Sequence, residues 1–262
     1  MELKFIGRGS AFNVREGNTS AYYKDELGNM LLIDCGETVF SRIVKLNLLG
    51  DVKNLYVAIT HLHPDHVGSL GSLIFYCYYI AHINVFIVDI ENEYDEDEYP
   101  LGEYLRISGI ETKMYSLVDT VIIGELNHID ICKTTHKPNM LSSMLLYYER
   151  PNKNTGVRTT VYTGDTNDIT RICEFVRSDR INKIYCDCCL ADYPDNPHLS
   201  LNTLANFIPI SHRNKIWCMH FDCDAAIKKA KDLGFNVVEF EKTSEEIVMT
   251  SICENFCKET IK

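Results

Sequence analysis

The chain has 262 residues, of which 45% are hydrophobic and 24% charged, and its formal net charge is −11 at pH 7. This balance is typical of a folded globular protein and excludes a disordered or collagen-like chain. The excess of acidic side chains disfavours a broad nucleic-acid groove or attachment to an anionic membrane surface. We therefore expect residues 1–262 to form a single globular domain.

Ten short apolar runs, rich in β-branched and aromatic residues, have the length of strands. They are residues 3–6, 30–33, 55–59, 84–90, 129–133, 144–148, 159–162, 184–186, 216–219 and 237–240. The apolar spacing predicts helices over residues 41–49, 67–79, 169–177, 201–207 and 225–233. This order predicts an α/β fold of two sheets covered on the outside by helices.

Targeting and membrane signals are missing from the pattern. No apolar run approaches the roughly 20 residues of a membrane span. The first five residues, MELKF, lack the basic region and long apolar stretch of a signal peptide. These features predict a cytoplasmic protein that does not insert into a membrane.

The 11 cysteines are odd in number and mostly scattered. Cys186 and Cys189 have C-x2-C spacing, but no second such pair completes a zinc ribbon. We expect reduced thiols that serve as small buried apolar residues, and the sequence leaves a redox role of this pair open. Residues 89–98 carry seven acidic residues in ten positions, which is typical of a solvated loop.

The strongest signal for chemistry is the segment Thr-His-Leu-His-Pro-Asp-His-Val-Gly at residues 60–68. Three of the nine histidines of the chain fall within six positions, directly after a predicted strand and before a predicted helix. His61 and His63 alternate and can converge on one ion, while Asp65 and His66 can face a second ion. Imidazole and carboxylate ligands suit zinc, with manganese or iron as alternatives.

The H-x-H-x-D-H pattern after a strand resembles that of the metallo-β-lactamase-fold hydrolases. The upstream Asp34-Cys35-Gly36 is similar to the family's Asp-x-Gly turn, whose aspartate braces the metal loop. His136, Asp165 in a Gly-Asp turn and His220 follow in the order the family shows. The resemblance covers nearly the whole chain, and it implies an αββα sandwich, in which two mixed sheets are flanked by helices.

The resemblance also implies two divalent metal ions, with Zn²⁺ expected and Mn²⁺ as the alternative. The first ion would take His61, His63 and His136. The second would take Asp65, His66 and His220, and Asp165 would bridge the two.

Two further segments resemble the RNase Z-like phosphodiesterase branch. The turn Gly7-Arg8-Gly9-Ser10-Ala11 is similar to a Gly-x-Gly-Ser-Ala turn of that branch, and its small residues allow close backbone approach. His198, followed after one residue by a serine, matches a histidine that protonates the leaving oxygen, and Asp187 matches the acid that supports it. We take His198, Asp187 and Asp65 as the catalytic candidates.

The interval from His136 to Asp165 is too short for the basic arm with which RNase Z grasps tRNA. Within the branch, the chain therefore most resembles the phage anti-Pycsar cyclic-nucleotide phosphodiesterases, which lack the arm. This resemblance implies hydrolysis of 3′,5′-cyclic mononucleotides to nucleoside monophosphates, removal of a defence or signalling nucleotide in the cytoplasm of a host cell, and a homodimer.

Three other functions stay open at this point. They are an RNase Z-like RNA-processing endonuclease, an acyl hydrolase such as a lactonase or thioesterase, and a catalytically inactive binding protein. The sequence does not identify the base of the substrate.

Overall fold

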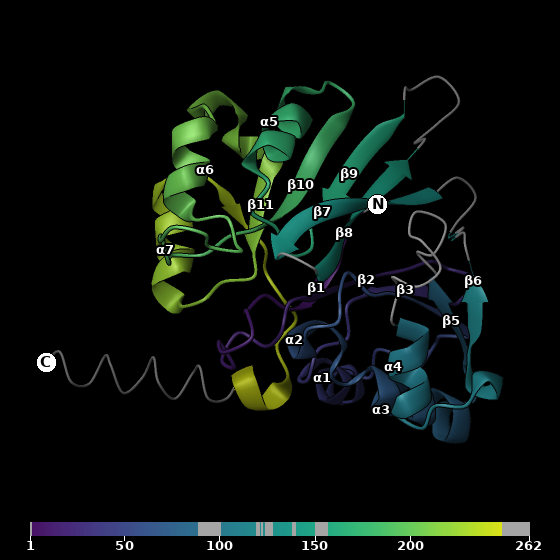
Figure 1. Ribbon diagram of the computed structural model, residues 1–262. Helices are drawn as coiled ribbons and strands as arrows, with labels where there is room; N and C mark the ends of the chain where they lie inside the picture. Colours follow the sequence, from purple (N-terminus) through teal and green to yellow (C-terminus); the bar gives the residue numbers. More distant parts are fainter. Residues whose placement is uncertain are drawn as a thin grey trace, which may run out of the picture.

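Two six-stranded mixed sheets lie face to face in the computed structural model, with helices on both outer faces (Figure 1). The structure describes residues 2–88, 101–118, 121, 123, 128–137, 140–149 and 157–247. The acidic run at residues 89–98 lies outside the described residues. The two facing sheets with helices on both outer faces confirm the predicted αββα class.

The first sheet has the order β1-β2-β3-β4-β5-β6. Its strands are β1 (Lys4–Gly7), β2 (Ser20–Lys24), β3 (Asn29–Ile33), β4 (Asn54–Ala58), β5 (Asn84–Val88) and β6 (Ser116–Val118). The first three strands pair antiparallel, and β3 to β6 pair parallel.

The second sheet has the order β12-β11-β10-β9-β8-β7. Its strands are β7 (His128–Lys137), β8 (Met140–Glu149), β9 (Arg158–Tyr162), β10 (Ile181–Asp187), β11 (Ile216–Met219) and β12 (Asn236–Val237). Here β7, β8 and β9 pair antiparallel, and β9 to β12 pair parallel.

The helices of the first half cover the first sheet and those of the second half cover the second sheet (Figure 1). They are α1 (Val39–Lys45), α2 (Pro64–Val67), α3 (Leu70–Tyr76) and α4 (Leu101–Ile107), then α5 (Ile169–Arg177), α6 (Leu201–Phe207) and α7 (Asp224–Asp232). A π-helical turn, η1 (Cys77–Ala81), and two 3₁₀ turns, η3 (Thr112–Met114) and η4 (Ile210–Lys215), complete the described elements. No helix in the described ranges is long and apolar enough to cross a membrane.

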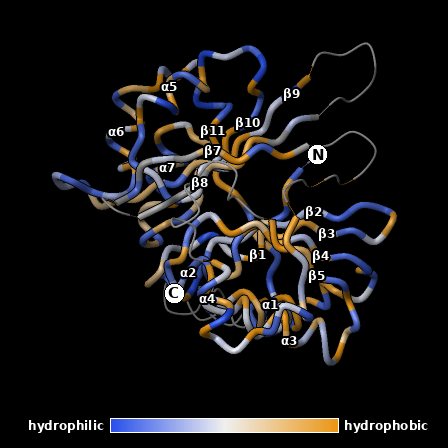
Figure 2. Tube along the Cα trace, turned by 45° about the vertical axis from the view of Figure 1, so that its right-hand side comes forward, coloured by the Kyte–Doolittle hydropathy of each residue, from blue (hydrophilic) through white to orange (hydrophobic). Residues whose placement is uncertain are grey.

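The core has three layers, which explains why the central strands are apolar without interruption. In β3, Met30 and Leu32 pack under the helices of the first half, while Leu31 and Ile33 face the second sheet. Because successive side chains of a strand point to opposite faces, a strand buried on both faces must be apolar throughout. Figure 2 shows this apolar band along the strands at the centre of the molecule.

Several predicted boundaries differ from the structure. Helices α5 and α6 begin and end where the spacing predicts. The expected helix over residues 67–79 is instead divided among α2, α3 and η1. Pro64 starts α2 early because its ring fixes the backbone angle of a first turn, and Gly68 and Ser69 separate α2 from α3. Strands β2 and β6 and helix α4 were not predicted. Strand β2 has no β-branched residue, β6 has only three residues, and α4 is short with two buried positions.

The described cysteines are all free, and six of these nine are buried. Burial raises the pKa of Cys186 and Cys188 well above the ordinary thiol value. Both are therefore protonated and apolar at neutral pH, in agreement with the expectation of structural thiols.

Candidate metal centre

The polar residues singled out in the sequence lie where strands of both sheets end. Asp34 and His61 follow the parallel neighbours β3 and β4 of the first sheet. Asp165, Asp187 and His220 lie at or just beyond the ends of β9, β10 and β11, which are also parallel. The carboxyl ends of parallel strands meet at one edge of a sheet, so these side chains converge there.

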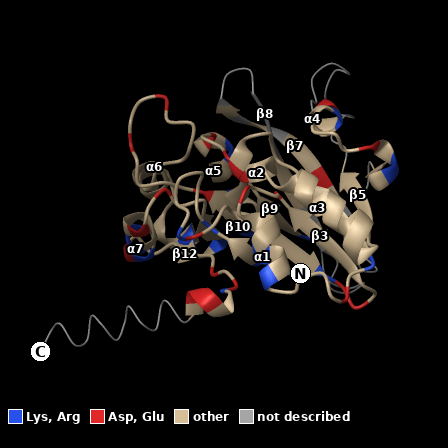
Figure 3. Cartoon of the chain, turned by 90° about the horizontal axis from the view of Figure 1, so that it is seen from below, with Lys and Arg blue, Asp and Glu red and all other residues tan. Residues whose placement is uncertain are grey.

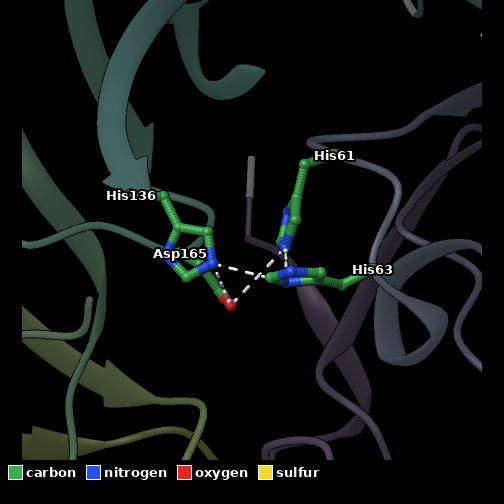
Figure 4. Close-up of side chains that lie close together, drawn as sticks. All are labelled: His61, His63, His136 and Asp165. Atoms are coloured by element: carbon green, nitrogen blue, oxygen red, sulfur yellow. Dashed lines mark hydrogen bonds and ion pairs between the residues drawn. The ribbon is translucent and has the colours of Figure 1, made fainter. Parts of the chain in front are cut away.

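A first group of donors consists of His61, His63, His136 and Asp165. Nδ1 of His63 lies 2.9 Å from Nε2 of His61 and 3.3 Å from Nε2 of His136. Oδ2 of Asp165 lies 3.7 Å from Nε2 of His61 and 3.8 Å from Nε2 of His136. Figure 4 shows the histidines of the first sheet entering from one side and His136 with Asp165 from the other.

A second group of donors consists of Asp65, His66, His220 and, again, Asp165. Oδ1 of Asp165 lies 3.3 Å from Nε2 of both His66 and His220. Oδ2 of Asp65 lies 3.5 Å from Nε2 of His66 and 3.3 Å from Nε2 of His220. The two oxygens of Asp165 therefore face different groups, and its carboxylate stands between them.

The chemistry of these donors fits bound cations. All ligand atoms of each group lie within 4.8 Å of one another, and nearly all the residues are buried. Nε2 of His66 is buried yet makes no hydrogen bond in the described part of the chain. A buried polar atom without a hydrogen-bond partner is costly, and an ion at the centre of the group would satisfy it.

Electrostatics within the two groups differ. Burial and the neighbouring His66 hold the pKa of His61 well below its usual value, so this imidazole is neutral, as a metal ligand must be. Burial also disfavours the charged form of His220, but the carboxylates of Asp165, Asp187 and Asp65 together outweigh burial and raise the pKa of His220 to about 10. In the second group, protons and cations thus compete for the same sites.

Asp34 holds the histidine-rich loop in place without joining either donor group. Its carboxylate accepts hydrogen bonds from the Thr60 backbone N–H at 2.7 Å and from the Thr60 hydroxyl at 2.9 Å. It also lies 2.9 Å from Nδ1 of His66. A carboxylate at Nδ1 fixes the ring so that Nε2 faces the ligand position, which is the bracing role the sequence predicts for Asp34.

His198 and Asp187 form a hydrogen-bonded pair beside the donor groups. Nδ1 of His198 lies 2.8 Å from Oδ2 of Asp187 and 3.8 Å from Oδ2 of Asp165. The fully buried Asp187 also accepts from the Thr166 backbone N–H at 3.0 Å. The structure thus brings together the histidine and the acid that the sequence pairs.

Asp187 makes a second contact that the sequence did not reveal. Its Oδ1 lies 3.2 Å from Nδ1 of His220. Burial favours a neutral imidazole at His198, but the charge and the hydrogen bond of Asp187, together with the charge of Asp165, outweigh burial and raise the pKa of His198 above its usual value. His198 therefore holds a proton more firmly than an ordinary histidine.

The N-terminal turn packs against the segment that carries His220. The backbone N–H of Ser10 donates to the Phe221 carbonyl at 3.0 Å, and a Cβ on Gly9 would lie 2.6 Å from the Asn13 carbonyl oxygen. A Cβ on Gly7 would collide with the Asn18 carbonyl oxygen. The close backbone approach that these small residues predict is confirmed.

A cavity of about 570 Å³ opens over the metal centre. Besides donor residues and His198, its wall includes Phe12, Tyr193, Glu37 and Asp222, none of which was a candidate from the sequence. Side chains that point into a cavity from separate loops follow no local spacing. The single available signal was the position of Asp222, two residues after the last histidine of the motif.

The fold is that of the metallo-β-lactamase-fold proteins, and this set of histidines and aspartates forms a candidate metal centre within it. The metallo-β-lactamase fold protein YhfI from Bacillus subtilis superposes with a TM-score of 0.63, at 16% identity, over 92% of this chain and 96% of that protein. The short form of human tRNase Z gives a TM-score of 0.60, at 18% identity, over 92% of this chain and 97% of that protein.

The particular family follows from sequence. The family model described as "Anti-Pycsar protein Apyc1" matches residues 1–243, and the chain belongs to this family. The anti-Pycsar protein Apyc1 of Bacillus phage 010DV004 is 25% identical over 239 residues, which cover 84% of this chain and 89% of the phage protein. The resemblance inferred from the motifs is confirmed.

Proposed function

We propose that the protein is a dinuclear-metal phosphodiesterase that hydrolyses 3′,5′-cyclic mononucleotides to nucleoside monophosphates and so removes a defence or signalling nucleotide. The observation that carries this proposal is the placement of Asp165, whose two carboxylate oxygens face two separate groups of buried donors. A carboxylate in this position is suited to bridge two cations.

In this proposal His61, His63 and His136 would hold one ion, Asp65, His66 and His220 would hold the other, and Asp165 would serve both. The mixture of imidazole and carboxylate donors favours Zn²⁺, with Mn²⁺ as the alternative. Two such ions, when bound, would supply positive charge to the phosphoryl oxygens and a nucleophile from water near neutral pH. The neutral His61 needs no deprotonation to serve as a ligand.

His198 takes the role of proton donor. Hydrolysis adds an oxygen of water to phosphorus and breaks the bond from phosphorus to the ribose 3′ oxygen, which must gain a proton to leave as a hydroxyl. The hydrogen bond at 2.8 Å from Nδ1 to Asp187 leaves Nε2 of His198 for the substrate and favours the protonated ring by raising the pKa of His198. Asp187 orients the ring and stabilises its charge.

The charge of the cavity wall favours a small substrate over RNA. Glu37, Asp65, Asp165 and Asp222 contribute carboxylates, and no lysine or arginine lies among the described residues of the wall. In the view of Figure 3, the lysines and arginines of the described residues are spread over several helices and loops. RNA binding needs several cations along the backbone, whereas one phosphodiester needs only the metal centre. The volume of about 570 Å³ also suits a small ligand.

Two further parts of the proposal come from the sequence and the family resemblance rather than from geometry. The protein acts in the cytoplasm, which is that of the host cell if a phage encodes it, and it forms a homodimer. Sedimentation or light scattering of the purified protein tests the second point, and a monomer at micromolar concentration would contradict it.

The proposed activity is tested with a panel of substrates and metal-replete protein, with EDTA-treated protein as the control. The panel contains 3′,5′-cyclic mononucleotides, cyclic dinucleotides, a precursor tRNA, a lactone and a thioester. We expect selective, metal-dependent opening of the cyclic mononucleotides. Cleavage of the tRNA alone would establish the RNA-processing alternative, and turnover of only the lactone or thioester would establish an acyl hydrolase.

A further inference from the structure

Two exposed aromatic side chains stand on the wall of the cavity above the metal centre. Phe12 is 95% exposed and Tyr193 is 56% exposed, and both line this cavity. A single exposed apolar side chain is common on any surface and carries no information. Phe12 and Tyr193 come from segments that follow strands of different sheets, yet both line the same cavity. This placement is informative because both rings border the space that a ligand would occupy.

Phe12 is presented by a turn that is fixed to the metal centre. The Asn13 side-chain amide donates to the Phe221 carbonyl at 3.0 Å, and the Ser10 backbone N–H donates to the same oxygen. The base of the turn is closed by the bond from the Gly9 N–H to the Gly17 carbonyl at 2.7 Å. Because Phe221 directly follows a residue of the second donor group, the backbone that carries Phe12 is held beside that group.

Tyr193 lies on the loop that carries His198, and this loop is also braced. Asp222 accepts from the Leu190 N–H at 2.9 Å and from the Ala191 N–H at 3.0 Å. The side-chain amide of Asn196 donates to the Ala191 carbonyl at 2.9 Å and accepts from the His198 N–H at 3.0 Å. Asn196 is thus engaged within its own loop, although it too lines the cavity.

The described residues of the remaining wall include no lysine or arginine that could bind a nucleotide phosphate. The carboxylates of this wall, at Glu37 and Asp222, repel phosphate, and Asp222 is already bonded to backbone N–H groups. The phosphodiester belongs at the metal centre, so the rest of the ligand must reach toward the mouth of the cavity. Aromatic rings gain free energy there by stacking on a flat heterocycle, which every nucleobase provides.

We infer that Phe12 and Tyr193 form the binding platform for the nucleobase of the substrate, while the metal centre holds its phosphate. This inference rests on the proposed function and adds to it the two residues that distinguish a nucleotide from other phosphodiesters. Stacking of a base on an aromatic ring changes affinity by roughly 5- to 150-fold on substitution by alanine.

The test compares kcat/KM for a 3′,5′-cyclic mononucleotide with kcat/KM for the 3′,5′-cyclic phosphate of methyl riboside, which has the same ring and no base. The variants are Phe12→Ala and Tyr193→Ala. Val14→Ala is the matched control for the first, because Val14 is 77% exposed on the same turn and outside the cavity wall. Tyr79→Ala is the control for the second, because Tyr79 is also 56% exposed and lies on η1.

We expect Phe12→Ala and Tyr193→Ala to lower kcat/KM for the nucleotide by about 5-fold or more and to leave the base-free substrate within about 2-fold. The control variants should change neither value, and Phe12→Trp and Tyr193→Phe should restore the nucleotide value. Equal losses on both substrates, or equal effects in the controls, would overturn the inference.

Failure of the proposed function is separable from failure of the platform. If wild-type protein hydrolyses neither substrate, the proposed function fails. Calorimetry then compares the affinity of metal-replete protein for a nucleoside 5′-monophosphate with its affinity for methyl riboside 5-phosphate. Tighter binding of the nucleotide that is lost in Phe12→Ala and Tyr193→Ala, but kept in Val14→Ala, would support the platform. Equal binding of the two ligands by wild-type protein would overturn it.

Discussion

Substitution of Gly36 by alanine tests whether the turn after β3 sets the position of the metal loop. A Cβ at this position would overlap the Asp65 carbonyl group and lie 2.9 Å from Cβ of Asn18. Neither side yields easily, because the Cys35 N–H donates to the His66 carbonyl at 2.6 Å and the Ser69 hydroxyl donates to the Gly36 carbonyl at 2.5 Å. The backbone at Asp65 must therefore move by roughly 1 Å or more, and a misplacement of that size can lower turnover by about 100-fold.

The assay measures kcat for a cyclic mononucleotide, bound metal per chain and the free energy of unfolding. We expect Gly36→Ala to lose about 100-fold in kcat, to bind the second ion more weakly, and to lose about 1–3 kcal/mol of stability through overpacking. Gly102→Ala in α4 is the control, since a Cβ there would have nothing within 4 Å. It should change stability by less than about 1 kcal/mol and leave kcat unaltered. Wild-type kcat and metal content in Gly36→Ala would refute the reasoning.

Three further predictions concern the groups around the ions. His198→Ala should slow the cyclic nucleotide, whose leaving group is an alkoxide, by about 10²- to 10⁴-fold, but should slow a p-nitrophenyl phosphodiester far less. Equal losses would remove its role as proton donor, and His212→Ala, an exposed histidine, is the control. Asp187→Asn should lower the pKa of His198, because the Asp187 carboxylate raises it. The alkaline limb of the pH–rate profile should therefore shift to lower pH than in wild-type protein. An alkaline limb at the wild-type pH would contradict the role of Asp187. Because carboxylates raise the pKa of His66 and His220, cation binding should release protons and weaken as the pH falls, which calorimetry in buffers of different ionisation enthalpy measures. Affinity independent of pH would contradict that competition.

The convergence of the metal-site residues was predictable because most of them occupy local patterns. His61, His63 and His66 fall within six positions after a strand, and Asp165 lies in a Gly-Asp turn whose glycine has a φ of 57°. Such spacing fixes where side chains lie relative to one strand end, and the parallel strands bring the ends together. The ligand roles themselves stay predictions, since proximity of donors is what the structure provides.

Other features depended on contacts between distant segments and left no local pattern. The run of residues 20–24 is short and contains no β-branched residue, so its sequence showed no strand pattern for β2. The contact from Asp187 to His220 joins the ends of two strands. Phe12 and Tyr193 line one cavity only after both sheets have formed. Side-chain directions of this kind follow from tertiary packing, which hydrophobic periodicity does not encode.

The most direct test of the central claim is a titration of metal-free protein with Zn²⁺ while conversion of a 3′,5′-cyclic mononucleotide to the 5′-monophosphate is followed. The variant Asp165→Asn keeps the size of the bridging side chain, and Asp179→Asn on the surface is its control. We predict that turnover rises to a plateau at two equivalents of Zn²⁺ per chain in wild-type and control protein, and that it stays near background in Asp165→Asn. Full activity at one equivalent, or in Asp165→Asn, would contradict the account.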